Sequence, residues 1–492
     1  MKKFLSGLRG KTLLIILTTT AALMQTSCHP RINKGGGPPT NHVSNWVNWN
    51  YIFKEGTDSA TRRLTIESAV AAVSNVRSGP VDTSKQRPVA TYNNGQIAIH
   101  PLTTYLSDYL RGAIHAKKDF FLDSVQVHFC SCHDTLLWNL TGNLNINIGG
   151  TGQSAPSPPG PPPPIATGDA VSTVDSNAIA NSPSSNKPLL DGGVVDFGGQ
   201  TQITDSVLLA VIDSGIDPGL FSPAIYNQLF ASDGSGTVNF VPYAPATGYK
   251  DDDPVRHGSA VAAIALDAFY AKSEGEQLRK LPRLMVLKAL DSTGRGSTFT
   301  VSCALSYAIS HKASLINLSL GYPNTRDQVI DHYLQLSARQ KIPVVAAAGN
   351  TPGDHDKPLC STHINRHHEL RPGNLFFPAC QSIDPGYYII SVTGLSSPDL
   401  PCQYQNFSPR YVSIGVVNKS SPNSCCGFAP AFISSGYVLD GSSFATPVIS
   451  GELGFRLMRN GHRSDAASCV QLLQPLSITS RFLTWQGQYI TY

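Results

Sequence analysis

The sequence predicts an α/β fold with a mostly parallel central sheet, preceded by a small N-terminal unit. From residue 201 onward, short apolar runs alternate with helix-length segments. The runs are continuously apolar, as in strands that are buried on both faces of a parallel sheet. A Pro-rich run at residues 156–164 separates this region from what precedes it, since such runs favour an extended, semi-rigid chain.

Length and composition also indicate more than one folded unit. The chain has 492 residues, more than a single hydrophobic core usually supports. Its net charge is only +4, which gives no case for nucleic-acid binding. We expect a tether, an N-terminal accessory domain or pro-domain, a Pro-rich linker and a larger second domain, with the boundaries 29–45, 46–148, 149–185 and 186–492.

The first 28 residues are typical of an export signal. A basic start, Met1–Lys3, precedes the apolar stretch Leu13–Leu17, which is short for a membrane span. The segment ends at Thr26–Cys28, which resembles a bacterial lipoprotein cleavage site. We therefore expect lipidation of Cys28 and anchoring in the bacterial cell envelope. Gln25 stands where leucine is commoner, and an ordinary cleaved signal that yields a secreted protein is the alternative.

The N-terminal unit carries no recognisable chemistry. Helices are plausible over Asp58–Val76, with Asp58 as the N-cap, and over Leu102–Ala116. Partial alternation over Phe120–Phe129 and again over Leu136–Ile148 favours strands.

In the second domain, apolar runs and helical segments follow each other regularly. Five runs predict strands: Val207–Ile212, Leu284–Leu290, Leu315–Leu320, Val344–Ala348 and Tyr388–Val392. Four segments predict helices: Gly258–Tyr270, Thr298–His311, Arg326–Gln340 and Ser443–Asn460. Parallel sheets bind ligands beyond the carboxyl ends of their strands, and Asp213 and Asn350 fall at such ends.

A serine within Gly441–Pro447 lies at a predicted strand-to-helix turn. A serine hydroxyl is a poor nucleophile at neutral pH and needs a base within hydrogen-bond reach. At Ser443, the first backbone N–H groups of the helix would lie beside negative charge that develops during attack. The alternative is a serine that only caps the helix.

A histidine and an aspartate precede this serine in the chain. His257 opens an alanine-rich helix and would be the base, although the preceding acids Asp251–Asp253 also suit an exposed loop. Asp213 follows six apolar residues and would orient the imidazole, with Asp217 as its rival. The order Asp, His, Ser is one of the known arrangements of the nucleophilic triad.

Two further signals occur at strand ends. Asn350 ends an apolar run, and its amide could donate to an oxyanion together with a backbone N–H at Ser443. Ser319, Leu320 and Gly321 could present a strand edge on which a peptide adds by β-augmentation. Strand-end caps and an ordinary strand-to-loop exit are the alternatives.

Four sequence blocks together resemble the signature blocks of subtilisin-like serine proteases, the subtilase family. The blocks are Val211–Gly215, His257–Ser259, Ala347–Asn350 and Gly441–Pro447. The resemblance covers roughly residues 200–460 and implies a subtilisin-like three-layer fold. It also implies a serine endopeptidase that cleaves polypeptides through an acyl-enzyme.

The resemblance further implies the roles of individual residues. Asp213, His257 and Ser443 correspond to the catalytic triad, and Asn350 corresponds to the oxyanion donor. Two segments correspond to the edges that bind substrate: Ser319–Gly321, and the strand that contains Gly294 and Gly296. No cofactor is implied for the reaction; structural calcium recurs in the family but maps to no residues here.

The chain departs from the family pattern in three places. Ser259 replaces the usual threonine, Ala260 replaces a frequent second histidine, and Phe444 stands where methionine is common. These exchanges leave the three reacting groups intact and bear on rate and specificity more than on activity. A catalytically silent subtilase that only binds peptides is the alternative function. A serine esterase of the α/β-hydrolase type is disfavoured, because Ala445 stands where its nucleophile elbow needs glycine.

Ten cysteines are present. Without Cys28 an odd number remains, so at least one is free or pairs with another molecule. Proximity favours Cys360 with Cys380, and Cys402 with Cys425 or Cys426. A zinc site at residues 130–133 and a metal-binding insertion in the His-containing region between Asn350 and Phe377 are less favoured alternatives.

Overall fold

A computed structural model describes the chain in segments that fall into two compact units. The first unit takes the described residues up to 176 and the second those from 179 onward. The described residues are 46–58, 60–62, 65–66, 88–93, 96–101, 120–122, 125–130, 137–143, 171–176, 179–181, 194–197, 201–230, 236–241, 248–323, 326–351, 364–417, 426–428, 439–460, 466–473, 477–478 and 483–492.

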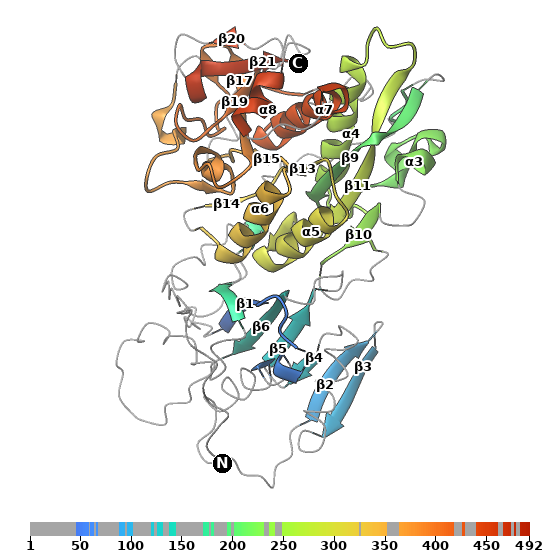
Figure 1. The fold of residues 1–492 in the computed structure, drawn as a ribbon, viewed down its shortest axis with the longest axis vertical. Helices are drawn as coiled ribbons and strands as arrows, with labels where there is room; N and C mark the ends of the chain where they lie inside the picture. The colour runs from blue at the N-terminus through green and yellow to red at the C-terminus, as the bar shows by residue number, and fades with distance from the viewer. Residues whose placement is uncertain are drawn as a thin grey trace, which may run out of the picture. The chain divides into compact units, whose positions relative to one another are not determined.

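The first unit contains a seven-stranded antiparallel sheet (Figure 1). In spatial order its strands are β3 (Gln96–Pro101), β2 (Pro88–Asn93), β4 (Phe120–Leu122), β5 (Val125–Phe129), β6 (Leu137–Asn143), β1 (Trp46–Phe53) and β7 (Val171–Ser176). Tyr51 and Trp138, opposite each other on β1 and β6, stack with ring centroids 4.3 Å apart. After β1, Asp58 accepts the backbone N–H of Thr61 at 2.9 Å, as expected of an N-cap.

The second unit is built on a long, mostly parallel sheet, as the continuous apolar runs predict. In spatial order its main path is β10 (Thr237–Asn239), β11 (Arg279–Lys288), β9 (Thr201–Asp213), β13 (Leu315–Leu318), β15 (Val344–Ala347), β17 (Ile389–Ser397), β19 (Ile414–Val417), β21 (Gln488–Thr491) and β20 (Ser477–Ile478). Neighbours from β10 to β21 are parallel, and β20 joins β21 antiparallel. The short strand β18 (Leu400–Pro401) pairs with β17 off this path.

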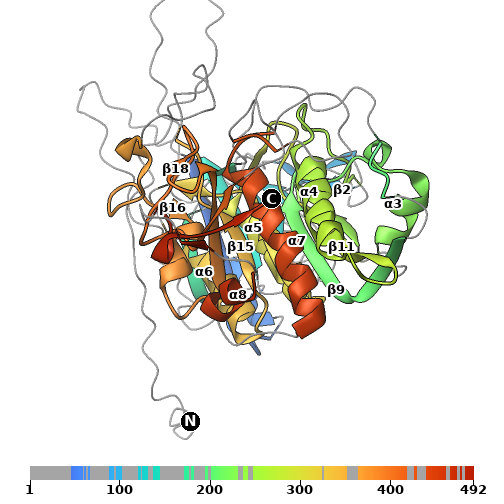
Figure 2. The same cartoon turned by 90° about the horizontal axis from the view of Figure 1, so that it is seen from above.

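Helices cover both faces of this sheet, which makes three layers (Figures 1 and 2). One face carries α4 (His257–Lys272), α7 (Ser442–Asn460) and α8 (Ala466–Leu472). The other carries α5 (Thr298–Ser310) and α6 (Gln328–Arg339). This arrangement explains why the strands read as unbroken apolar runs, since neither face meets water. The α/β fold with a mostly parallel central sheet is therefore confirmed.

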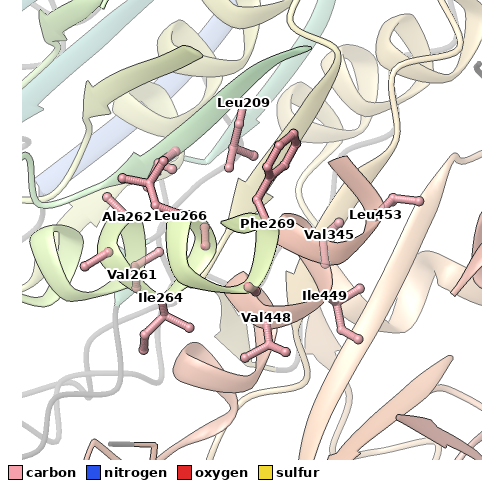
Figure 3. Packing of buried hydrophobic residues seen from close by; sticks show 14 of the residues in the cluster. Leu209, Val261, Ala262, Ile264, Leu266, Phe269, Val345, Val448, Ile449 and Leu453 are labelled. Carbon is pink, nitrogen blue, oxygen red and sulfur yellow. The ribbon is translucent and has the colours of Figure 1, made fainter. Parts of the chain in front are cut away.

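The core of this unit lies where α4 and α7 meet above β9 and β15. Leu209, Phe269 and Leu453 are almost fully buried there and are drawn in Figure 3. The two helices approach closely at Gly451, where an added Cβ would lie only 2.2 Å from the carbonyl oxygen of Ala265. A glycine at this position therefore sets how closely the two site-bearing helices pack.

Shorter elements complete the second unit. They are α3 (Pro223–Leu229), the single turns Pro218–Leu220, Arg366–His368, Ala379–Ile383 and Trp485–Gly487, and the strand pairs β12 (Arg295–Ser297) with β8 (Ile179–Asn181) and β14 (Tyr322–Pro323) with β16 (Phe376–Phe377). Within the residues that the structure describes, no helix has both the length and the apolar character needed to cross a membrane.

Two strands lie in the stretch that we expected to be linker, 149–185. β7 pairs with β1 in the first unit, whereas β8 belongs to the second. The division between the units falls between these two strands, within the stretch expected to be linker. The predicted signal segment with Cys28, the tether, the helix over Leu102–Ala116 and the Pro-rich run lie outside the described residues.

The cysteine predictions meet with mixed success. Cys402 forms a disulfide with Cys426, one of the two partners proposed for it. The predicted pairing of Cys380 with Cys360 is wrong, because the Cys380 thiol is free and accepts the backbone N–H of Phe376 at 3.3 Å. Burial raises the pKa of this thiol to about 11, so it stays protonated at neutral pH. Cys130 is also buried and free.

Candidate active site

The three residues predicted to form a triad come from three different elements of the second unit. Asp213 is the last residue of β9, His257 is the first of α4, and Ser443 lies in the first turn of α7. All three are fully buried. The strand end and the two helix starts thus bring together residues that are up to 230 positions apart in the chain.

Asp213 and His257 form the pair that the sequence predicts. The Nδ1 atom of His257 lies 2.8 Å from Oδ1 of Asp213, which also accepts the N–H of Ser214 at 2.7 Å. An ionised carboxylate only accepts hydrogen bonds, so the proton of the neutral imidazole resides on Nδ1. The lone pair therefore resides on Nε2, the nitrogen that a general base needs.

The surroundings of His257 favour its charged form. Burial alone would lower the pKa of His257, but the charge and hydrogen bond of Asp213 raise it, and so do the charges of Asp253 and Asp251. The net pKa lies above the usual value for histidine. A positive charge on this imidazole is thus stabilised by the three carboxylates.

The hydrogen bond that we expected between Ser443 and His257 is not formed in this structure. The Ser443 hydroxyl donates instead to the backbone oxygen of Ser319 at 3.0 Å. His257 Nε2 is buried and has no hydrogen-bond partner among the described residues. The ring of Phe444, next to Ser443, lies 5.0 Å from the His257 ring between centroids. Contacts between a nucleophile and its base are often loose without substrate.

Pro447 explains how the backbone of Ser443 is held. Proline has no N–H, so the carbonyl oxygen of Ser443, four residues earlier, receives no helical hydrogen bond. The Ser319 hydroxyl supplies the missing donor at 2.7 Å. Buried Asn317 in turn donates to Ser319 Oγ at 2.9 Å and accepts from the Ser450 hydroxyl at 2.7 Å. Asn317, which we did not predict, therefore fixes Ser319 under the start of α7.

The proposed oxyanion donor Asn350 lies beside the start of α7. Its Oδ1 accepts both the backbone N–H and the hydroxyl of Ser442, each at 3.1 Å. Because a backbone N–H requires an acceptor, these bonds identify the amide oxygen and direct Nδ2 the other way. Gly441 has a φ of +123°, and a Cβ there would lie 3.0 Å from Asn350 Nδ2. Glycine thus permits the positive φ of this turn and also leaves room for the Asn350 amide.

The first predicted substrate edge is buried in this structure. Ser319, Leu320 and Gly321 are all buried. An added Cβ at Gly321 would lie 2.3 Å from the ring of Phe376 and 2.4 Å from the backbone oxygen of Phe377. The absence of a side chain at Gly321 therefore lets β16 lie directly against this edge.

The second predicted edge is already paired with the chain itself. Gly296 lies in β12, which pairs antiparallel with β8, so that Gly296 stands opposite Ala180. Gly294 forms the turn before β12 with a φ of +69°. The edge on which a peptide was expected to add can therefore hold an extended segment.

The three acids before His257 suit an exposed loop by their sequence, but two of them are buried. Asp251 and Asp253 are 3% and 5% exposed. Asp253 accepts the N–H of Val255 at 3.2 Å and that of His257 at 3.3 Å, which helps to cap α4. Asp252 instead contacts the buried Lys288 at 2.6 Å. Among the described residues, no group of three His, Cys, Asp or Glu side chains could hold a metal ion.

Comparison with known proteins gives two relatives with related sequences. The minor extracellular protease Epr of Bacillus subtilis (strain 168) is 30% identical over 149 residues, which cover 30% of this chain and 20% of that protein. The thermophilic serine proteinase of Bacillus sp. (strain AK1) is 25% identical over 200 residues, which cover 38% of this chain and 45% of that protein. The chain thus spans less than half the length of either relative.

The model of the subtilase family matches residues 204–473, which is more than half of the chain. The matched range contains both helices that begin at the site, most of the strand that ends in Asp213 and the turn that carries Asn350. The chain therefore belongs to the subtilase family.

Proposed function

We propose that the chain is a serine endopeptidase in which Ser443 is the nucleophile, His257 the general base, Asp213 its orienting acid and Asn350 an oxyanion donor. The observation that carries this proposal is the 2.8 Å contact between His257 Nδ1 and Asp213. It fixes the tautomer in which Nε2 can accept a proton, beside the helix start that bears Ser443.

The reaction begins with attack of Ser443 Oγ on a peptide carbonyl carbon. The hydroxyl proton passes to His257 Nε2, and the carbonyl oxygen becomes an oxyanion. The Nδ2 of Asn350 and the backbone N–H at Ser443 donate to that oxygen, and the positive end of α7 adds to the stabilisation. Asp213 stabilises the imidazolium without taking its proton.

Collapse of the tetrahedral intermediate completes acylation. The C–N bond breaks, His257 gives its proton to the leaving amine, and the acyl group stays on Ser443 as an ester. Water then attacks this ester with His257 again as base, which releases the second product and restores the serine. All groups in these steps are side-chain or backbone groups, so we expect no cofactor; any bound calcium would have a structural role.

Polypeptides are the substrates we propose. An extended peptide can add to the edge formed by β12 through main-chain hydrogen bonds once β8 leaves that edge, as strands do in β-augmentation. The pairing of β8 with β12 supports this, because the same edge accepts an extended segment of the chain itself. Ser319–Gly321 would contact the opposite side of the substrate once Phe376 or its neighbours move aside.

A fluorophosphonate probe tests the assignment of the nucleophile. The folded protein should be labelled and should hydrolyse casein-type polypeptides, and Ser443→Ala should abolish both. Ser206→Ala, a change of an exposed serine on β9, should affect neither. If the folded wild-type protein takes no label, the proposal fails and the silent peptide-binding alternative holds.

We further propose that Cys28 becomes lipidated after export, which would anchor the protein in the bacterial cell envelope. Two relatives are described as an extracellular protease and a serine proteinase, and the first of these descriptions supports export. Mass spectrometry of the mature protein tests the proposal: an acylated N-terminal Cys28 is expected, and an unmodified chain that begins elsewhere overturns it.

A further inference from the structure

Three backbone segments meet with almost no space between them behind the Asp213–His257 pair. An added Cβ at Gly258, the second residue of α4, would lie 2.5 Å from the backbone oxygen of Gly215. At Gly215, where φ is +114°, a Cβ would lie 2.3 Å from the backbone oxygen of Tyr249. The turn after β9, the start of α4 and the segment before Asp251 are therefore in direct backbone contact.

The Asp251 side chain bonds to two of these segments at once. Its Oδ1 accepts the hydroxyl of Ser214, the residue after Asp213, at 2.9 Å. Its Oδ2 accepts both the N–H and the hydroxyl of Ser259, two residues after His257, at 2.8 and 2.6 Å. Ser214 and Ser259 are fully buried, so water does not compete for these bonds.

The direction of each hydroxyl is determined by a backbone N–H. Ser214 Oγ accepts the N–H of Gly258 at 2.9 Å, and Ser259 Oγ accepts the N–H of Asp217 at 2.8 Å. Each hydroxyl therefore donates to Asp251, whose two oxygens must both be acceptors. Burial raises the pKa of Asp251, while the hydrogen bonds from Ser259 and Ser214 act in the opposite direction and favour the carboxylate. A carboxylate meets the requirement for two acceptors, whereas a carboxamide would turn an N–H₂ group toward a donor.

We propose that Asp251 is a positioning residue of the triad, which locks the Asp213 turn to the start of the His257 helix. The inference rests on the proposed function of Asp213 and His257. The three consecutive acids would then have three different roles. Asp251 positions the triad, Asp252 pairs with Lys288, and Asp253 caps α4. A displacement of about 1 Å between catalytic groups is enough to cost roughly 100-fold in rate.

The charge of Asp251 adds a second effect. The charged groups that act on His257 are Asp213 from β9 together with Asp253 and Asp251 from the segment before α4, and all three raise its pKa against the effect of burial. From α7 the histidine faces the uncharged ring of Phe444. Removal of the Asp251 charge should therefore lower the pKa of His257.

The test compares Asp251→Asn with the wild-type protein. We expect kcat for a peptide amide substrate to fall roughly 10- to 100-fold while KM changes less than about threefold, since Asp251 contacts no substrate. The acid limb of the pH profile of kcat/KM should move to lower pH. A fall in the folded fraction alone would reduce the rate at every pH without moving this limb.

Two controls separate positioning from stability. Asp331→Asn removes another buried acid, which lies on α6 and contacts Arg326 before that helix and Gln381 in the turn after β16. This change should leave kcat unchanged in the folded fraction. Ser259→Thr keeps the hydroxyl and should retain activity, whereas Ser259→Ala should lose it as Asp251→Asn does.

A second measurement tests the inference without any need for proteolysis. It is the pKa of His257, followed by NMR on histidine-labelled protein in the Ser443→Ala background. It should be lower in Asp251→Asn than in the background, and His257→Ala identifies the signal. If this shift occurs in a chain that never hydrolyses peptides, the proposed function fails while the inference stands. An unchanged pKa, or unchanged kcat in folded Asp251→Asn, overturns the inference.

Discussion

At the scale of single residues, Asn350 is the part of the site whose contribution can be isolated most cleanly. Its Oδ1 accepts two hydrogen bonds from Ser442, so the orientation of Nδ2 is already set before substrate arrives. Asn350→Ala should lower kcat by about 10²–10³-fold with little change in KM, which is the loss seen when the corresponding donor is removed from subtilisin itself. Asn374→Ala, a change of an exposed asparagine, is the control. Equal losses in kcat and in substrate affinity would contradict the assignment.

We expect His257, as the proposed base, to determine how activity depends on pH. The base works only when neutral, so kcat/KM should rise with pH through the pKa of His257 in the free enzyme. Because the net effect of its surroundings raises that pKa, the midpoint of the acid limb should lie above the usual histidine value of about 6.5. A pH profile measured with a neutral peptide substrate checks this. A midpoint at or below that value would mean that burial outweighs the three carboxylates.

Local sequence context was enough to predict which residues stand at the strand end and the helix starts of the candidate site, but not the contacts that hold them. Asp213 ends a largely buried strand, His257 begins a helix and Ser443 lies in the first turn of another, so short patterns locate them. The burial of Asp251 could not be predicted, because consecutive acids usually face water. Its partners Ser214 and Ser259 are 37 and 8 residues away, and only the fold brings all three together.

At the scale of elements, the predicted strands and helices of the second domain agree with the structure where the apolar runs are long. β9, β11, β13, β15 and β17 each correspond to a predicted run. The sheet extends beyond them to β19 and β21, which were missed. Gly415 interrupts the apolar residues of β19, and β21 begins and ends with polar residues and is mostly half-exposed, so neither produces the continuous apolar run that marks a buried strand.

The packing of α4 against α7 predicts a contrast between two glycines of the same helix. At Gly451 an added Cβ would lie 2.2 Å from the backbone oxygen of Ala265, whereas at Gly454 the nearest atom, on the Phe269 ring, is 3.3 Å away. Gly451→Ala should lower the free energy of unfolding by about 1–3 kcal/mol through overpacking. Gly454→Ala should be close to neutral, because the gain in helix propensity of up to about 1 kcal/mol offsets a mild contact. Denaturant unfolding in the Ser443→Ala background measures both, and equal losses would contradict the packing described.

At the scale of the whole molecule, two compact units with separate cores should unfold as two cooperative transitions. Leu453 in α7 and Leu137 in β6 are each almost fully buried, one in each unit. Leucine-to-alanine changes in cores cost about 2–5 kcal/mol. In calorimetry of the Ser443→Ala protein, Leu453→Ala should therefore lower one transition by roughly 5–10 °C and leave the other in place. Leu137→Ala should do the reverse. A single transition that moves with either substitution would mean that the first unit is an integral part of the peptidase fold rather than a domain with a stability of its own.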